Sequence, residues 1–388
     1  MTSPEPTTLA PAQAHGQSLA HGAAGIALPH IERALAGHGS WADAHALIRK
    51  AATGPVDASD HAGLYYGAPA IAFMLHTAGA PGRMRYRRAL SILDRHVVRL
   101  ACRRLSAAGH RIEKGAHPHF NEYDLFYGLV GIGSVLRLRV PGSDTFAEVL
   151  RYLVRLVLQP SSRHGTPVPG WWASNDPDPT LPTPGGHANL GMAHGAAGIL
   201  AFLALAVGDG CAVDGQLEAI DQLAGWFEDW RQDSTDGPWW PQWITLEELR
   251  QGRTNQLGPG RPSWCYGSTG ILRALQLAAL ATGDVRKQRA AERSLTETLT
   301  ARNIARISEA GLCHGAAGLY QTVYRAAHDS ADPLLKRRLP TLADALTCSG
   351  EPGEEGLLNG HAGVDLASET MRRGAPPRSG WDRCLLIT

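Results

Sequence analysis

Long apolar stretches alternate along this chain with stretches of mixed polarity. Residues 199–207 and 271–281 are almost wholly apolar, which is typical of helices that are buried on all sides. The segments that follow them, 216–231 and 285–302, place apolar residues at helical spacing among charged ones, as half-solvated helices do. The pattern therefore predicts pairs of helices, each with a buried inner member and an outer member.

A short glycine motif precedes each apolar stretch. The sequence His-Gly-Ala-Ala-Gly occurs at residues 21–25, 194–198 and 314–318, and looser copies keep the leading glycine. Steps of 45 to 72 residues separate the leading glycines, which leaves room for two helices and their loops. The leading glycines are Gly22, Gly67, Gly128, Gly195, Gly267, Gly315 and Gly360. A second glycine follows three residues later except after Gly67, where Ala70 stands instead. We expect these glycines to permit positive φ and close backbone approach at each turn.

Seven helical pairs with such apolar inner members predict an all-α fold of the α/α-toroid class. In this double ring, seven inner helices are surrounded by outer ones, and the glycine turns gather at one end. Alternating strand patterns are nearly absent. We expect residues 1–14 to form a flexible N-terminal segment and residues 15–388 a single toroid domain. The stretches 103–119 and 160–186 are expected to be irregular.

Charge and cysteine usage narrow the function classes. The 388 residues include 37 Lys plus Arg and 36 Asp plus Glu, so no strong field would attract nucleic acid or anionic lipid. No signal peptide and no apolar run of about 18 residues is found, which predicts a cytoplasmic protein without membrane insertion. Six widely spaced cysteines do not resemble a disulfide framework. Some of them are therefore available to hold a metal.

Two of the glycine turns carry metal-ligand residues. Cys265 lies two residues before Gly267, and Cys313 lies at the equivalent position before Gly315, with His314 beside it. If the turns converge, two thiols and an imidazole meet, as in a catalytic zinc site with an open coordination position. The spacing has none of the CxxC pattern that marks zinc sites strongly. The alternative that these cysteines are small buried hydrophobic residues stays open.

Three further residues are candidates for acid–base or anion chemistry. His194 occupies the same repeat position as His314 without a neighbouring thiol, so it is either an acid or base or a histidine satisfied beside a helix start. Asp124 is a lone carboxylate in an aromatic stretch. This predicts that it is either exposed at the mouth, the end of the toroid where the glycine turns gather, or paired, with His194 a plausible partner. Arg261 either stabilises a developing anion or is an ordinary surface arginine.

These residues together resemble the lanthionine synthetase C family. The resemblance is carried by residues 189–195, by 261–267, by 313–315, and by Asp124 with Gly128, and it extends over nearly the whole chain. It implies a toroid with seven inner helices and a Zn²⁺ ion bound by Cys265, Cys313 and His314. It also implies an acid–base pair of His194 and Asp124, with Arg261 and Tyr266 at further active-site positions.

The resemblance implies a lanthipeptide cyclase. Such an enzyme adds cysteine thiols of a dehydrated precursor peptide to dehydroalanine or dehydrobutyrine, and a lanthipeptide dehydratase is a possible partner. Two alternatives stay open: an enzyme that adds glutathione to dehydrated residues, and a non-catalytic toroid that binds a peptide.

Overall fold

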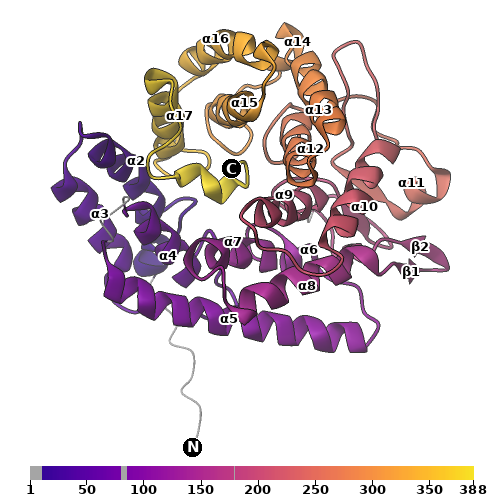
Figure 1. The fold of residues 1–388 in the computed structure, drawn as a ribbon, viewed down its shortest axis with the longest axis horizontal. Coiled ribbons are helices and arrows are strands. Elements are labelled where there is room, and N and C mark those ends of the chain that lie inside the picture. Colours follow the sequence, from indigo (N-terminus) through magenta and orange to yellow (C-terminus); the bar gives the residue numbers. More distant parts are fainter. Residues whose placement is uncertain (1–10, 80–84, 179) are drawn as a thin grey trace, which may run out of the picture.

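A computed structural model describes residues 11–79, 85–178 and 180–388. Within this part of the chain, seven helices form the inner ring shown in Figure 1. They are α2 (Ala23–Ala36), α4 (Ala68–Thr77), α7 (Leu129–Arg139), α9 (Ala196–Gly208), α12 (Ser268–Thr282), α15 (Ala316–Asp329) and α17 (His361–Arg373). Each of them begins directly after one of the seven leading glycines, which is its N-cap residue. The predicted fold class is thereby confirmed.

An outer ring of helices encloses the inner one. It consists of α3 (Trp41–Ala52), α5 (Arg87–Glu113), α8 (Asp144–Leu158), α10 (Gln216–Asp229), α13 (Val285–Thr298) and α16 (Pro333–Cys348). Burial follows the sequence pattern, because every residue of α9 from Ala196 to Ala206 is buried, whereas α13 buries only one face. The hydrophobic core therefore lies within the inner ring and between the two rings. None of the helices in the described ranges is long and apolar enough to span a membrane.

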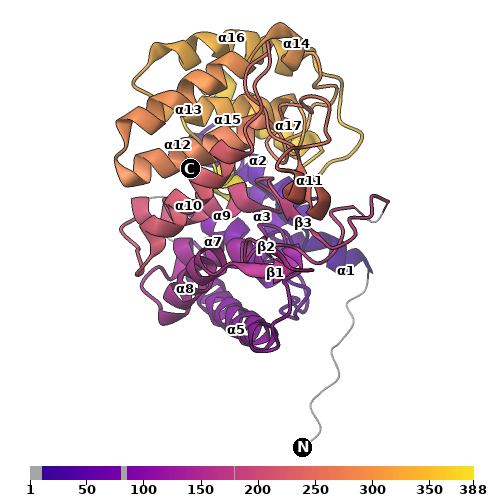
Figure 2. The same cartoon turned by 90° about the vertical axis from the view of Figure 1, so that its right-hand side faces the viewer.

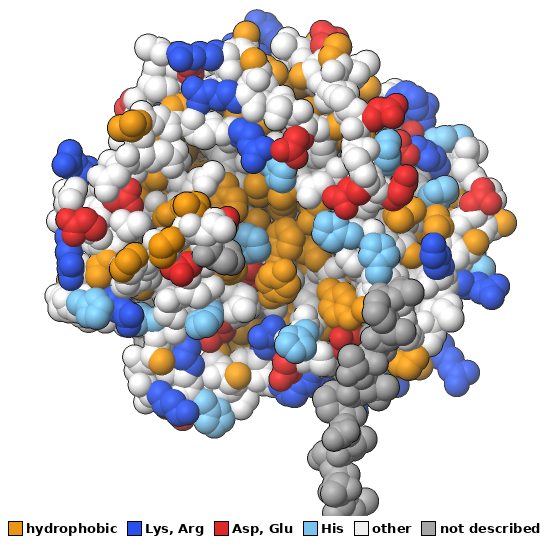
Figure 3. Space-filling view, turned by 180° about the vertical axis from the view of Figure 1, so that it is seen from behind, with side chains coloured by type: hydrophobic (Ala, Val, Ile, Leu, Met, Phe, Trp, Pro, Cys, Tyr) orange, Lys and Arg blue, Asp and Glu red, His pale blue; other side chains and the backbone are white. Residues whose placement is uncertain are grey.

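Short elements occupy the connections. The short helices are α1 (Pro11–Gly16), α6 (Phe120–Tyr123), α11 (Leu246–Gln251), α14 (Ala301–Ile304) and the 3₁₀-helix η1 (Trp381–Leu385). Two antiparallel ribbons join β1 (Ser161–Arg163) to β2 (Thr166–Val168) and β3 (His187–Asn189) to β4 (Trp243–Thr245). In Figure 2, α1 and β3 lie on the side of the molecule opposite the C-terminus. That side, seen in Figure 3, is hollowed near its centre, with apolar side chains in the hollow and histidines around it.

Two expectations about irregular segments have different outcomes. Residues 160–186 are a long connection that contains the β1–β2 ribbon. The prediction that 103–119 is irregular is wrong for residues 103–113, which form the last turns of α5, because its apolar positions Leu105 and Ala108 continue the buried face of that helix. Of the segment expected to be flexible, residues 1–10 lie outside the described residues, and residues 11–14 belong to α1.

Close backbone approach explains the second glycine of each motif. In six turns a β-carbon on this glycine would lie only 1.8–2.4 Å from the carbonyl oxygen of the residue six positions earlier. The pairs are Gly25 with Leu19, Gly131 with Leu125, Gly198 with Met192, Gly270 with Trp264, Gly318 with Leu312, and Gly363 with Leu357. Any larger residue would push the turn away from its helix. The expectation of close approach is thus confirmed.

The second turn enters its helix differently. Among the seven leading glycines, only Gly67 has a positive φ, of 73°, so the expectation of positive φ is wrong for the other six. The same turn is the one in which the sequence has Ala70 in place of the second glycine. Ala70 is nevertheless fully buried.

Backbone hydrogen bonds join neighbouring turns into what we call the turn belt. In each bond, the N–H of a residue two or three positions before one leading glycine donates to the carbonyl of the residue two positions before another leading glycine, on a neighbouring turn. The N···O distances are 2.9–3.3 Å. The six bonds run from Leu19 to Tyr65, Leu125 to Ala193, Ala193 to Cys265, Cys265 to Cys313, Cys313 to Leu358, and Leu358 to Ala20. Between the second and third turns, the ring of Tyr65 stacks on Phe126 with centroids 4.4 Å apart. The turn belt therefore fixes the order and spacing of the turns around the mouth.

The last repeat departs from the predicted scheme of seven helical pairs. After α17 the described chain forms no outer helix but turns inward through η1, and Trp381, Leu385 and Ile387 are fully buried. Trp264 donates from its indole nitrogen to the Leu385 carbonyl at 2.8 Å, and the Tyr65 hydroxyl donates to the Cys384 carbonyl at 2.8 Å. This final segment thus fills the centre of the inner ring beneath two of the turns.

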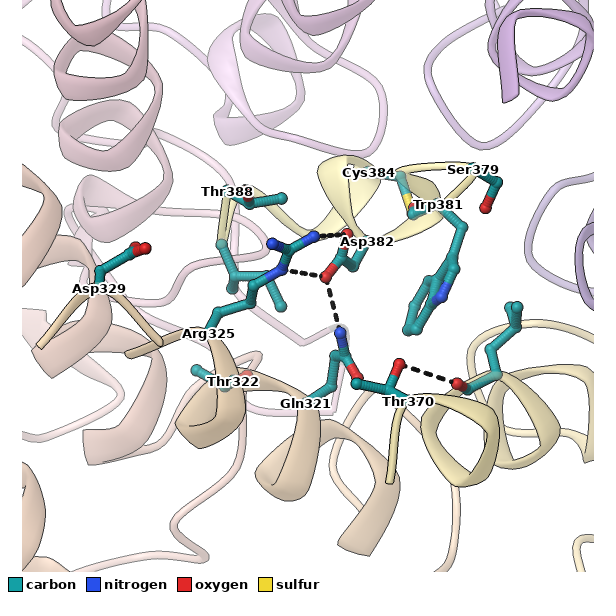
Figure 4. Close-up of polar contacts among 12 residues, drawn as sticks. Gln321, Thr322, Arg325, Asp329, Thr370, Ser379, Trp381, Asp382, Cys384 and Thr388 are labelled. Atoms are coloured by element: carbon teal, nitrogen blue, oxygen red, sulfur yellow. Dashed lines mark hydrogen bonds and ion pairs between the residues drawn. The ribbon is translucent and has the colours of Figure 1, made fainter. Parts of the chain in front are cut away.

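A buried carboxylate fixes this segment in place. The two oxygens of Asp382 accept hydrogen bonds from Arg325 at 2.6 and 2.8 Å, and one of them also accepts a bond from Gln321 at 2.7 Å (Figure 4). Because all three side chains are buried, water screens the attraction between Arg325 and Asp382 only weakly. Removing either partner would leave an uncompensated buried charge.

We predict that Gly318→Ala destabilises the fold by about 2–4 kcal/mol, because the added methyl group would lie 1.8 Å from the Leu312 carbonyl oxygen. Gly109, inside α5, has no heavy atom within 4 Å of the equivalent position, so Gly109→Ala should leave stability unchanged or raise it by about 0.5–1 kcal/mol. Chemical denaturation of both variants measures the difference, and equal stabilities would contradict the role assigned to close approach.

The buried side chain of His187, in β3, should make the folded protein less stable in acid. Burial lowers the pKa of this fully buried imidazole to about 4, below its ordinary value of 6.5. The unfolded chain therefore takes up a proton between these two values while the folded chain does not, and stability falls as the pH drops through this window. Between pH 7 and pH 5 this costs about 2 kcal/mol. Denaturation of His187→Gln across this range should show a shallower pH dependence than the parent protein, and an identical dependence would refute the assignment.

Candidate metal centre and active site

The fifth and sixth turns bring two thiols and an imidazole together. Cys265 precedes α12, and Cys313 and His314 precede α15, so no contact between them follows from neighbourhood in the sequence. The turn belt bond from the Cys265 N–H to the Cys313 carbonyl, at 3.2 Å, joins these two turns. As a result, the potential ligand atoms of Cys265, Cys313 and His314 all lie within 4.8 Å of one another.

The chemistry of this group fits a divalent cation. A tetrahedral zinc ion with its usual bond lengths holds ligand atoms about 3.5–3.8 Å apart, within the spread found here. A hydrogen bond from the Cys313 thiol, and then one from His314, hold the pKa of Cys265 well below its ordinary value, while the Cys265 thiolate raises the pKa of Cys313. Only one thiol therefore loses its proton readily, and a bound cation is what would stabilise both thiolates.

The ligand group contains three side chains. Among the described residues, no fourth histidine, cysteine or carboxylate joins it. Cys265 is buried, whereas Cys313 and His314 are partly exposed. An ion bound by these three groups would keep a coordination position for another molecule, as catalytic rather than structural zinc sites do.

A histidine–carboxylate pair stands in the fourth and third turns. Asp124 Oδ2 lies 2.6 Å from His194 Nδ1, and Asp124 Oδ1 accepts the backbone N–H groups of Tyr127 and Gly128, both at 2.7 Å. The carboxylate side chain is fully buried, whereas 21% of the His194 side chain is exposed. Because an ionised carboxylate only accepts, Nδ1 of His194 carries the proton, and in the neutral ring Nε2 offers a lone pair.

Aromatic rings pack against this imidazole. The rings of Phe120 and Phe126 lie 5.3 and 4.7 Å from that of His194, centre to centre. Tyr266, at 6.1 Å, belongs to the fifth turn and therefore connects the histidine pair to the turn that carries Cys265. Its hydroxyl accepts a bond from the Asn189 side chain at 3.2 Å, and burial raises the pKa of Tyr266 well above its ordinary value. Tyr266 therefore stays protonated and can donate to a ligand.

A carboxylate connects Arg261 to the ligand group. Its guanidinium donates to Glu309 Oε1 at 2.9 Å, and Glu309 Oε2 lies 2.7 Å from Nε2 of His314. Arg261 is nearly half exposed, so it can also contact a bound molecule.

The structure thus brings the predicted site residues together around one mouth, from the third to the sixth turn. Reasoning from the sequence did not assign roles to Asn189, Glu309, Phe120 or Phe126. Asn189 lies six residues before Gly195, and Glu309 lies six residues before Gly315, so the shared repeat position was a usable signal for both. The two phenylalanines come from the irregular approach to the third turn, where the pattern of the repeat gives no such signal.

Comparison with known proteins shows the family and the fold of this chain. The profile of the family described as lanthionine synthetase C-like protein matches residues 13–386. This chain belongs to that family. It is 25% identical over 264 residues to the nisin biosynthesis protein NisC of Lactococcus lactis subsp. lactis, an alignment that covers 66% of this chain and 60% of that protein. The solved structure of nisin cyclase superposes with a TM-score of 0.78 at 21% identity, covering 96% of this chain and 93% of the other. That likeness establishes the α-toroid fold.

We predict that Asp124→Asn reverses the tautomer of His194. The two backbone N–H groups keep the oxygen of the new amide on their side, so its NH₂ group faces His194 and donates to Nδ1, which moves the ring proton to Nε2. Nitrogen-15 NMR of the imidazole distinguishes the two tautomers. Persistence of the Nδ1–H form in the variant would show that Asp124 does not fix the ring.

Proposed function

We propose that this chain is a zinc-dependent lanthionine synthetase that cyclises a dehydrated precursor peptide. The observation that carries the proposal is that the three-ligand group and the His194–Asp124 pair lie on adjacent turns, which the turn belt bond from the Ala193 N–H to the Cys265 carbonyl and the ring of Tyr266 connect. Family membership supports the same reaction class. A structural metal would need neither an open position nor a neighbouring acid–base pair.

In the proposed reaction, a cysteine thiol of the peptide adds across the double bond of a dehydroalanine or dehydrobutyrine. A carbon–sulfur bond forms at the β-carbon, the alkene electron pair moves toward the carbonyl to give an enolate, and the α-carbon then takes a proton. The thiol proton and the α-carbon proton balance, so no further reactant is needed. Cys265, Cys313 and His314 would hold Zn²⁺, which when bound lowers the pKa of a coordinating thiol.

The other residues have separate roles in this proposal. Nε2 of His194 accepts the thiol proton and later returns a proton to the α-carbon, while Asp124 holds the ring in the required tautomer. The hydroxyl of Tyr266 and the guanidinium of Arg261 donate to the peptide or to the enolate oxygen. The aromatic rings around His194 keep water from the reacting carbon.

The proposal also includes the substrate, the partner enzyme and the compartment of the reaction. The partner is a dehydrated peptide, and a lanthipeptide dehydratase that supplies it is proposed to act nearby in the cytoplasm. The wide hollow at the mouth suits a peptide chain whose several cysteines react in turn.

We predict that two substitutions separate metal binding from acid–base chemistry. Cys265→Ala should lose zinc and turnover together, because it removes a ligand. His194→Asn should keep stoichiometric zinc and lose about 10²–10⁴-fold in rate, because it removes the proton-transfer group. Metal analysis and turnover of a dehydrated peptide measure both effects. Cys102→Ser removes an exposed thiol outside the site and should change neither. Retained cyclisation in both site variants would refute the proposal.

The choice of thiol is tested with two peptides. A dehydrated peptide that contains cysteines should form internal thioethers without added thiol. The matched peptide without cysteines should stay unmodified when glutathione is supplied. Thioethers formed only from added glutathione would instead assign the chain to the glutathione-adding class.

A further inference from the structure

Glu309 makes contacts at the site for which the proposed function has no role. One carboxylate oxygen lies 2.7 Å from Nε2 of His314, and the other accepts from Arg261 at 2.9 Å. Its backbone carbonyl accepts the N–H of Ala316 at 2.8 Å, which fastens Glu309 to the first turn of α15. Glu309 thus lies between two groups of the candidate site and is itself held by the helix that follows it.

The contact with Nε2 decides how His314 can act as a ligand. A carboxylate next to Nε2 keeps the proton on that nitrogen, so in the neutral ring Nδ1 is the nitrogen whose lone pair is available to a metal held with Cys265 and Cys313. Carboxylates that hold the outer nitrogen of a ligating histidine fix the ring orientation and raise its basicity. The contact is therefore of the kind that strengthens metal binding.

We propose that Glu309 is a positioning residue that orients His314 toward the metal and Arg261 toward the reacting peptide. The proposal rests on the proposed function, because it assumes that Cys265, Cys313 and His314 bind zinc. The contact with Arg261 joins the fifth turn to the sixth through side chains, in addition to the turn belt bond between Cys265 and Cys313. Loss of Glu309 would release both the imidazole and the guanidinium.

The seventh turn offers a matched control. Glu354 lies six residues before Gly360, as Glu309 does before Gly315, and it contacts Nδ1 of His21 at 2.9 Å. Both glutamates are substantially exposed, at 48% for Glu309 and 38% for Glu354, so replacing either one costs little folding energy. His21 is not part of the ligand group. Glu354→Ala therefore removes an equivalent carboxylate from the same mouth without touching a metal ligand.

The test measures zinc affinity of the full-length protein by competition with a chromophoric chelator. Glu309→Ala should bind zinc 10–100-fold more weakly than the parent protein. Glu309→Gln keeps an oxygen that accepts from Nε2, so it should lose less than Glu309→Ala. Glu354→Ala should stay within threefold of the parent. Arg261→Ala should also keep its zinc affinity and lose turnover, because it leaves the contact between Glu309 and His314 intact.

Each outcome bears on a different claim. Unchanged affinity in Glu309→Ala overturns the proposal, and so does an equal loss in Glu309→Ala and Glu354→Ala, which would indicate a general effect of charge. Thermal unfolding of the metal-free variants checks that the fold is retained. A parent protein that binds no zinc rejects the proposed function itself, whereas a parent that binds zinc and cyclises its peptide, with Glu309→Ala equal to it in affinity, rejects only the role of Glu309.

Discussion

The structure depends on the turn belt, the series of backbone hydrogen bonds that connects the segments before the leading glycines. The bond between the Cys265 N–H and the Cys313 carbonyl fixes the fifth turn relative to the sixth at the point where the ligands lie. Because these groups are backbone atoms, the belt tolerates changes of side chain, and different turns can carry cysteine, histidine or tyrosine at equivalent positions.

The glycines are the condition under which the belt can form. In six of the seven motifs, the carbonyl of the residue six positions earlier passes so close to the second glycine that a β-carbon would overlap it. Each turn is therefore folded tightly against the helix that it starts. The segment that carries Trp381 and Asp382 supports the turns from below, since it fills the centre of the inner ring and accepts hydrogen bonds from Tyr65 and Trp264. The turns around the mouth therefore pack against a buried C-terminal segment.

Two histidines at the mouth meet carboxylates in different environments. Asp124 is fully buried and saturated by backbone N–H groups, so it has one fixed orientation for His194. Glu309 is about half exposed, and its two carboxylate oxygens contact different partners, one His314 and the other Arg261. A rigid buried carboxylate suits a ring that transfers protons, whereas a shared carboxylate suits a ring that we propose to bind a metal.

The sequence by itself determined the inner helices, their starts and the repeat, because a wholly apolar stretch after a glycine motif has few alternatives to a buried helix. It also singled out Cys265, Cys313, His314 and His194 as candidate site residues, since equivalent repeat positions point to the same end of the toroid, and it added Asp124 and Arg261 beside other turns. Only the tertiary structure decided which turns are neighbours and how far apart their side chains lie. The inward path of residues 374–388, the packing of the Phe120 and Phe126 rings against His194, and the contact of Glu309 with His314 were decided there as well. These features depend on contacts between segments far apart in the chain, and no local pattern of hydrophobic and polar residues encodes such a contact.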